Sequence, residues 1–230
     1  PTISDAGTLT TGNELSTLPA TNLQTRAITE RWRTSGLSSI YIVVDLLTAQ
    51  AIDLIFLAGT NASGTATWQI RGATSEANLT AAPGYNSGSL THWPQTALDD
   101  WSSTYAIKTL IGSAQTYRWW RIDITDASNT DGYYEAGRLY LASVWQPEIN
   151  AQFEAGHRWV NESQDSLSLG GQLWIDERAS RRLWTGRLGF LTPAEALVAF
   201  ANFQRLRGGK KDVVFLSDPA STQLQEVSIY

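Results

Sequence analysis

The sequence predicts a mainly β protein in two parts. Only 17% of the 230 residues are charged, whereas Trp, Thr, Ser and Gly are plentiful, and this balance favours strands and turns over solvent-exposed helices. Apolar residues make up 42% of the chain, which is enough to form a core. Helix-type spacing with capping signals occurs in one segment, so we expect strands throughout and a single helix.

Charge and composition exclude several classes of function. The net charge is −5 and neither end carries a run of Lys or Arg, so the basic surface typical of nucleic-acid or anionic-membrane binding is missing. The absence of cysteine excludes disulfides, thiolate metal sites and a Cys nucleophile. No apolar run approaches the ~20 residues of a membrane span. We expect no nucleic-acid partner, no membrane span and no cofactor.

The first part, residues 1–144, begins with buried strands. β-Branched and aromatic residues at 39–46 predict one strand and residues 51–58 the next, with a short connection at 48–50. Residues 67–72 alternate bulky and polar side chains, the period of a half-buried strand. Residues 77–113 contain several turn-forming pairs and read as a long loop, which usually exists for contact.

A strand, turn, strand unit closes this part. Residues 117–124 predict a strand, residues 127–132 a turn and residues 133–141 a second strand. Alternation places Trp119 and Trp120 on opposite faces, so at least one belongs to the core. We expect Trp32 to be structural as well.

The second part, residues 145–230, begins at Trp145-Gln146-Pro147, because proline does not fit a central strand. A polar stretch at 161–171 precedes predicted strands at 172–176 and 182–190. In the latter strand we expect three core side chains, which are Leu183, Leu188 and Phe190.

The predicted helix spans residues 193–207. Thr192-Pro193-Ala194-Glu195 forms a capping box with proline at the first helical position, and Gly208-Gly209 ends the helix. Ala196, Phe200 and Phe203 share one face, which we expect to pack against a sheet. Residues 211–217 predict a closing strand.

The first part resembles discoidin-type, galactose-binding-like modules. The resemblance rests on residues 31–35, 44–46 and 51–55, then on the Tyr-Arg-Trp-Trp-Arg-Ile run at 117–122 and the closing strand at 135–141. It covers about 140 residues. It implies a jelly-roll β-sandwich.

The second part is similar to the tail-tube-like fold of siphophage tail-tip proteins, especially distal tail proteins. The resemblance implies a bacteriophage tail-tip or baseplate component in the virion, made in the host cytoplasm, that forms a homo-oligomeric ring between the tail tube and the host-adsorption apparatus. Its partners would be the tail tube and the hub. The sandwich precedes the tube-like region here, whereas the usual order is the reverse, so a distal tail, minor tail or baseplate hub protein all fit.

Enzymatic signals are weak, and we expect no catalytic residues. The only histidines are His92 and His157, and the Gly-x-Ser-x-Gly elbow of serine hydrolases is absent. The adjacent acids Asp99-Asp100 and Asp176-Glu177 would point to opposite faces of a strand, which does not suit the paired carboxylates of a glycosidase.

One turn carries candidate metal ligands. Asp126, Asn129 and Asp131 supply the oxygen atoms that calcium prefers, but their spacing differs from an EF-hand. A plain Asx-rich turn explains the same residues. Both interpretations stay open.

Aromatic residues in the predicted loop are the candidate contact site. Tyr85, Trp93 and Trp101 would stack on the sugar rings of a host surface glycan, which makes carbohydrate binding the alternative function. Equally, they would cover the sandwich end or contact a neighbouring subunit.

Arginines beside Asp176 and Glu177 give the second part a mixed-charge rim. Arg178, Arg181 and Arg182 would either discourage strand aggregation at a solvated edge or contact a ring neighbour through matched charges.

Overall fold

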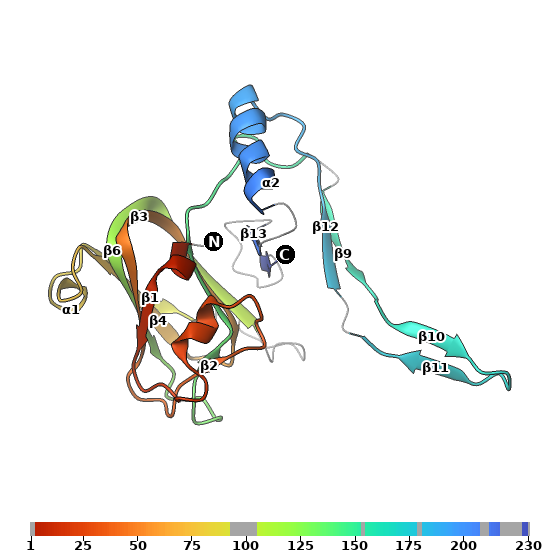
Figure 1. Cartoon of the computed structure of the whole chain (residues 1–230), viewed down its shortest axis with the longest axis horizontal. Helices are drawn as coiled ribbons and strands as arrows, with labels where there is room; N and C mark the ends of the chain where they lie inside the picture. The colour runs from red at the N-terminus through yellow and green to blue at the C-terminus, as the bar shows by residue number, and fades with distance from the viewer. Residues whose placement is uncertain are drawn as a thin grey trace. The chain divides into compact units, whose positions relative to one another are not determined.

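The computed structural model describes residues 3–92, 105–152, 155–178, 181–207, 212–216 and 227–229. The chain divides into two compact units (Figure 1). Unit 1 comprises Pro1–Val144 together with Lys211–Tyr230, and unit 2 is Trp145–Lys210. The sequence placed residues 211–230 in the second part, whereas the described residues 212–216 contact unit 1. These contacts join residues that are far apart in the sequence, which no local pattern encodes.

Most of the regular structure described in unit 1 is strand, which confirms the mainly β prediction. Its strands are β1 (Thr8–Thr11), β2 (Trp32–Arg33), β3 (Ile40–Thr60), β4 (Thr67–Ala73), β5 (Tyr85–Thr91), β6 (Tyr105–Thr125), β7 (Glu135–Ala136), β8 (Arg138–Ala142), β13 (Val214–Leu216) and β14 (Val227–Ile229). Short helical turns occur at η1 (Ile3–Ala6), η2 (Ala20–Gln24) and α1 (Asn78–Ala81).

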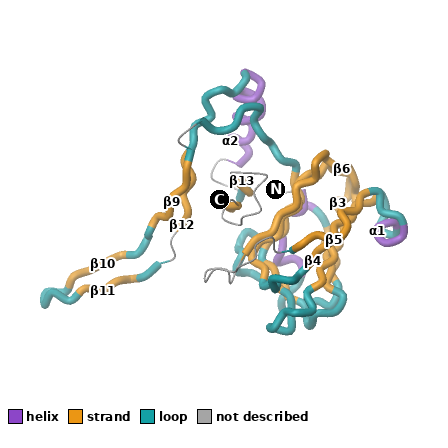
Figure 2. The backbone as a smooth tube through the Cα atoms, turned by 180° about the vertical axis from the view of Figure 1, so that it is seen from behind, coloured by secondary structure: helices purple, strands orange, loops and turns teal. Residues whose placement is uncertain are grey.

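The main sheet is antiparallel, with strand order β1-β3-β6-β4-β5, and β8 pairs with the second half of β3 (Figure 2). The long strands β3 and β6 run side by side and form its centre. β2 pairs with β7, and β13 pairs with β14, in separate two-stranded ladders. The predicted strand, turn, strand unit at 117–141 is therefore not a hairpin, because β6 and β8 each pair with β3.

β3 is one strand where the sequence predicted two strands and a connection. The expected connection at 48–50 is an irregularity inside the strand, at which the register with β6 jumps between Asp45 and Gln50. Leu47 there has a left-handed φ of 64°, and its backbone N–H donates to Asp45 Oδ1 at 2.9 Å. Pairing with β6 on both sides holds the turn residues within the sheet.

A second irregularity between Ile52 and Leu54 changes which side chains face inward. Beyond it, Ile55 and Leu57 pack in the main core, whereas Leu54 and Phe56 form a separate cluster on the opposite face. The strand thereby presents apolar side chains on both faces.

The main core holds the largest aromatic side chains. Trp32, Trp68 and Trp120 are fully buried in it, which confirms the structural role expected of Trp32. Trp120 is the core member of the Trp119–Trp120 pair, while Trp119 packs on the other face beside Val43.

The predicted long loop at 77–113 contains regular structure. Its first part forms α1 and β5, and β6 begins at Tyr105. β5 pairs with β4, from Thr67 opposite Thr91 to Gly72 opposite Tyr85. Its Asn, Ser and Gly residues have low strand propensity, so this strand depends on the pairing with β4 rather than on local preference.

Unit 2 contains a two-stranded antiparallel ribbon. β9 (Gly156–Val160) pairs with β12 (Arg181–Thr185), and β10 (Gln164–Leu167) pairs with β11 (Leu173–Asp176) (Figure 2). The predicted polar stretch at 161–171 therefore includes a strand. β12 ends at Thr185 instead of continuing to 190, and Phe190, expected in a core, is 61% exposed. No facing layer covers it among the described residues of this unit.

The helix of unit 2 follows the sequence prediction at its start. Thr192 N and Oγ1 donate to Glu195 Oε2, and Glu195 N donates to Thr192 Oγ1, which confirms the capping box. The helix continues through a π-helical stretch, η3 (Glu195–Phe200), into α2 (Ala201–Arg207). Its aromatic face contacts Trp145, 5.9 Å from Phe200 between ring centres, rather than the predicted sheet.

Candidate functional site

The aromatic candidates are only in part within the described structure. Tyr85 lies in β5 and packs against the main core, with its ring centre 5.9 Å from that of Trp120. Burial raises the pKa of its hydroxyl. This placement favours the interpretation of Tyr85 as part of the sandwich packing. Trp93 and Trp101 lie outside the described residues.

The acidic turn after β6 is a closed hydrogen-bond network. Asp126 is 2% exposed and accepts hydrogen bonds from Ser63 N, Ser63 Oγ and Asn129 Nδ2. Asn129 also donates to Asn61 O and accepts from the backbone N–H of Asp131. No group of three or more His, Cys, Asp or Glu that would suit a metal ion occurs within the described ranges. The contacts favour an Asx-type turn that joins two loops.

The arginine candidates lie on the ribbon of unit 2. Arg178 forms an ion pair with Asp176, Nη2 to Oδ2 at 2.8 Å, and both side chains are more than half exposed. Arg181 and Arg182 belong to β12, opposite Val160 and Trp159. Arg178 therefore follows β11, and Arg181 and Arg182 lie in β12.

A polar and aromatic cluster at one end of unit 1 was not predicted. The guanidinium of Arg33 lies 4.0 Å from the ring centre of Tyr133 and donates through Nη2 to Glu135 Oε2 at 2.7 Å. Asn61 Nδ2 donates to Asp131 Oδ2 and to the Tyr133 carbonyl. The sequence signal was Arg33 within the discoidin-like run, but nothing local indicates that residues 100 positions apart would meet.

The segment that carries Trp93 and Trp101 begins and ends near this cluster. Before it, the backbone N–H of His92 donates to Ala66 O at 2.8 Å. After it, Tyr105 is opposite Thr60, the residue that precedes Asn61. The cluster and both ends of the segment therefore belong to the same end of the sandwich.

His92 itself is an interior group of unit 1. Its Nε2 lies 2.7 Å from the Tyr134 hydroxyl, and its ring packs on Trp68. Burial lowers the pKa of the His92 imidazole to about 4, against a smaller opposing effect of Asp126. The side chain is therefore neutral at physiological pH, and its role is in packing.

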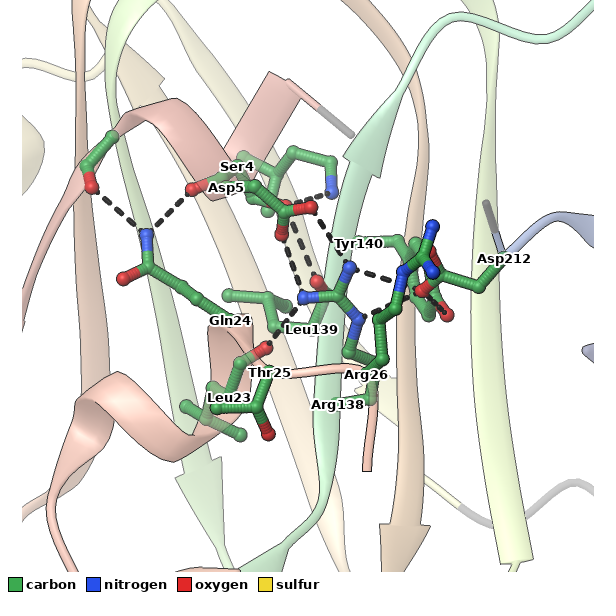
Figure 3. Close-up of polar contacts among 12 residues, drawn as sticks. Ser4, Asp5, Leu23, Gln24, Thr25, Arg26, Arg138, Leu139, Tyr140 and Asp212 are labelled. Atoms are coloured by element: carbon green, nitrogen blue, oxygen red, sulfur yellow. Dashed lines mark hydrogen bonds and ion pairs between the residues drawn. The ribbon is translucent and has the colours of Figure 1, made fainter. Parts of the chain in front are cut away.

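The most buried charged group is Arg138, at the start of β8 (Figure 3). Its side chain is 1% exposed and lies between two carboxylates. Asp5 accepts from Nη1 and Nη2 at 2.6 and 2.9 Å, and Asp212 accepts from Nε and Nη2 at 3.1 and 3.0 Å. The Tyr140 hydroxyl donates to Asp212 Oδ2 at 2.6 Å. The cluster thus connects β8 to residues near both ends of the chain.

Electrostatics in this cluster favour the charged forms of Arg138 and Asp212 and the neutral form of Tyr140. Burial opposes the charge on Arg138, but the hydrogen bonds and charge of Asp5 outweigh it and raise the pKa of the guanidinium. Burial also opposes ionisation of Asp212, yet Tyr140 and Arg138 lower the pKa of that carboxyl. Burial and the carboxylate of Asp212 raise the pKa of the Tyr140 hydroxyl. Every group is engaged in an ion pair or hydrogen bond, an arrangement suited to holding segments together.

Unit 2 differs because its large apolar side chains are uncovered. None of its described residues is buried. The apolar side chains with the largest exposed fractions are Leu169, Leu197, Leu167, Ile175, Trp174, Phe190, Val198, Leu173, Trp159 and Ile149. Several belong to the ribbon and others to the helix. This set is the candidate contact surface of unit 2.

Comparison with known proteins gives fold-level likenesses only. No family model and no curated protein matches the chain. Among solved structures, SpGH29 is 12% identical with a TM-score of 0.45, and the match covers 64% of this chain but 28% of that one. The family 32 carbohydrate-binding module of C. perfringens NanJ, solved with galactose, is 16% identical with a TM-score of 0.45, covering 61% and 96%. A fucolectin from striped bass serum is 13% identical with a TM-score of 0.47, covering 70% and 55%.

These identities and TM-scores do not establish a shared function. No helix within the described ranges is long and apolar enough to span a membrane.

Proposed function

We propose that this chain is a non-catalytic structural subunit that assembles with further copies of itself through unit 2. The observation that supports this proposal is the uncovered apolar surface of the ribbon and helix. Trp174 is 61% exposed and Ile175 62% exposed in β11, and Trp159 is 55% exposed in β9. Burial against a neighbouring copy removes these side chains from water.

Within the described residues, each ladder of the ribbon has two strands and no third. An isolated two-stranded hairpin is at best marginally stable in water, and further strands or a packed helix normally stabilise it. β9 pairs with β12, and β10 with β11, in ladders of two strands each. A neighbouring copy that adds strands or covers one face would supply what each ladder lacks.

The setting we infer is the ring of a bacteriophage tail tip or baseplate, located in the virion. This part of the proposal rests on the sequence resemblance of the second part to tail-tube-like proteins. Arg178, Arg181 and Arg182 would contact acidic side chains of the next copy, and the tail tube and hub would be the other partners. A distal tail, minor tail or hub protein remains compatible with it.

Light scattering combined with electron microscopy tests the assembly. We expect the purified protein to form closed rings, and Trp174→Ser with Ile175→Ser to shift it to monomers while the sandwich stays folded. Leu47→Ser is the matched control, because Leu47 is 55% exposed on unit 1. A strictly monomeric wild-type protein would contradict the proposal.

Carbohydrate binding by unit 1 is the second candidate. The observation that favours it is the cluster of Arg33, Tyr133 and Asp131 at the end of the sandwich where the segment with Trp93 and Trp101 begins and ends. Aromatic faces beside planar polar groups suit sugar rings and their hydroxyls.

A glycan array followed by calorimetry tests this candidate. We expect binding to be lost in Trp93→Ala, Trp101→Ala or Tyr133→Ala and kept in Trp145→Ala, which changes an exposed residue of unit 2. Failure of all glycans to bind would reject it and leave the assembly proposal intact.

A further inference from the structure

One face of unit 1 is covered by a short segment near the C-terminus. The outward side chains of β3 and β8 form an apolar cluster of Leu54, Phe56, Ala58 and Tyr140. Val214 and Leu216 of β13 pack against this cluster. These two side chains cover the cluster together with Leu110, Ala142 and Val144.

A charged contact anchors the same segment. The carboxylate of Asp212 accepts from Arg138 and from the Tyr140 hydroxyl, and Arg26 Nε lies 3.7 Å from its Oδ1 (Figure 3). Asp5, on η1, is the other acid of this cluster and forms its own ion pair with Arg138. Arg138 and Arg26 are both cations, and Asp5 offsets one of the two charges. One positive charge is therefore left for the carboxylate of Asp212.

The side chains that make these contacts follow the period of an extended strand. Asp212, Val214 and Leu216 alternate with their neighbours, so in an extended backbone they project to one side. The acidic side chain of Asp212 therefore meets the cationic Arg138. The apolar side chains two and four positions later meet the apolar cluster of β3 and β8, which we call the apolar strip.

None of the described strand ladders joins β13 to the main sheet. Its ladder partner is β14, from Val214 opposite Ile229 to Leu216 opposite Val227, while the described ladder of β8 is with β3. The segment is also separated from β8 along the chain by unit 2. Side chains of Asp212, Val214 and Leu216 join it to unit 1.

Arg138 also has hydrogen-bond partners outside this segment. Asp5 keeps a two-point ion pair with Arg138, and the Leu23 carbonyl accepts from Nη1 at 3.3 Å. If Asp212 leaves, Arg138 therefore stays paired with Asp5. The free-energy cost of releasing the segment then comes mainly from the hydrogen bonds lost by Arg138 Nε and the Tyr140 hydroxyl and from exposure of the apolar strip.

We propose that the outer face of β3 and β8 is a docking surface for an extended Asp-x-Val-x-Leu peptide, which the chain's own residues 212–216 occupy reversibly. In the closed state the segment hides the apolar strip. In the open state the strip and the Arg138 site are free to bind the same sequence supplied as a separate peptide. This surface lies in unit 1, so the inference is independent of the assembly through unit 2.

A peptide-exchange experiment on the full-length chain tests this. The probe is a fluorescent synthetic peptide with the sequence of residues 211–217, and the readout is anisotropy. The wild-type chain should bind it weakly, because a tethered segment competes at a high effective concentration. Asp212→Asn in the chain should strengthen peptide binding, and the same change in the peptide should weaken it by at least about tenfold.

Hydrogen exchange distinguishes release of the segment from unfolding. In Asp212→Asn, amides at 213–216 should exchange at least about tenfold faster, while those of β3 and β6 stay protected. Asp165→Asn, which removes an exposed carboxylate of β10, is the matched control and should change neither readout.

Three results would overturn the proposal. One is failure of the peptide to bind the Asp212→Asn chain, and another is unchanged protection of 213–216 in that variant. The third is loss of protection in β3 and β6 together with the segment, since the segment would then be an integral part of the fold. Tyr140→Phe keeps the ring and removes one hydrogen bond to Asp212, so it is a milder variant for the same hydrogen-exchange comparison. Far-ultraviolet circular dichroism checks that this variant is folded.

Discussion

Unit 1 buries Trp32, Trp68 and Trp120, whereas none of the described residues of unit 2 is buried. Trp120 is 0% exposed in the sandwich and Trp174 is 61% exposed on the ribbon, although both lie in strands. The charged groups differ in the same way, because Arg138 is 1% exposed and Arg178 is 51% exposed. This contrast indicates that unit 1 is stabilised by its own core, whereas the ribbon of unit 2 needs contacts beyond its own strands for stability.

The largest expected difference concerns the two tryptophans. Trp120→Ala should destabilise unit 1 by about 4 kcal/mol, because it leaves a cavity in the core. Trp174→Ala should change the free energy of unfolding of unit 1 by less than about 0.5 kcal/mol. Urea unfolding followed by circular dichroism measures both. Equal effects would show that the ribbon and the sandwich unfold as one cooperative body.

Arg138 and Arg178 test the same comparison between the two units for charged groups. Arg138→Ala should cost roughly 3 kcal/mol, since it leaves the partly buried carboxylates of Asp5 and Asp212 without the buried cation between them. Arg178→Ala breaks an exposed pair with Asp176 and should cost less than about 1 kcal/mol. The same unfolding assay applies, and a small effect at Arg138 would mean that water replaces the guanidinium without penalty.

Acid should act on unit 1 through His92. Its pKa in the folded state, about 4, lies below the ordinary value of 6.5, so protons bind the unfolded chain more readily in this range. Stability should therefore fall as the pH drops from about 6.5 to 4, by up to roughly 3 kcal/mol from this group. Unfolding curves against pH should flatten in His92→Gln and keep their slope in His157→Gln, the matched change in unit 2.

The smallest expected effect is at the helix cap of unit 2. Thr192→Ala removes the hydroxyl that accepts from Glu195 N and should destabilise the helix by about 1 kcal/mol. Hydrogen exchange should show faster opening of η3 and α2 only. Propagation of the effect to β3 or β6 would show that the helix packs as part of the sandwich.

Elements with strong local signals were predictable from the sequence. The strand at 67–72, the capping box at Thr192–Glu195 and the mainly β class follow from alternation, capping residues and composition. β5 was missed because its Asn, Ser and Gly residues resemble a loop, and pairing with β4 overrides that preference. The irregularity at Asp45–Gln50 was read as a connection for the same reason, since the partner strand β6 is remote in sequence.

Of the candidate site residues, the sequence located Arg178, Arg181 and Arg182 together because they are close along the chain. It did not find the Arg33–Tyr133–Glu135 cluster or the Arg138–Asp5–Asp212 cluster, whose members are 74 to 133 positions apart in the bonds that join them. Tyr85 was expected in a contact loop, and its packing on Trp120 depends on where β5 pairs.

By itself, the sequence determined the class of structure, the start of the helix and the absence of cysteine chemistry, because these depend on composition and on neighbours within a few residues. Only the tertiary structure decided that residues 212–216 lie against unit 1 and that Asp212 meets Arg138 there. It also decided that the ribbon leaves Trp174 and Ile175 uncovered. Burial and ion pairing are set by which strands meet in space, and that information is spread over the whole chain.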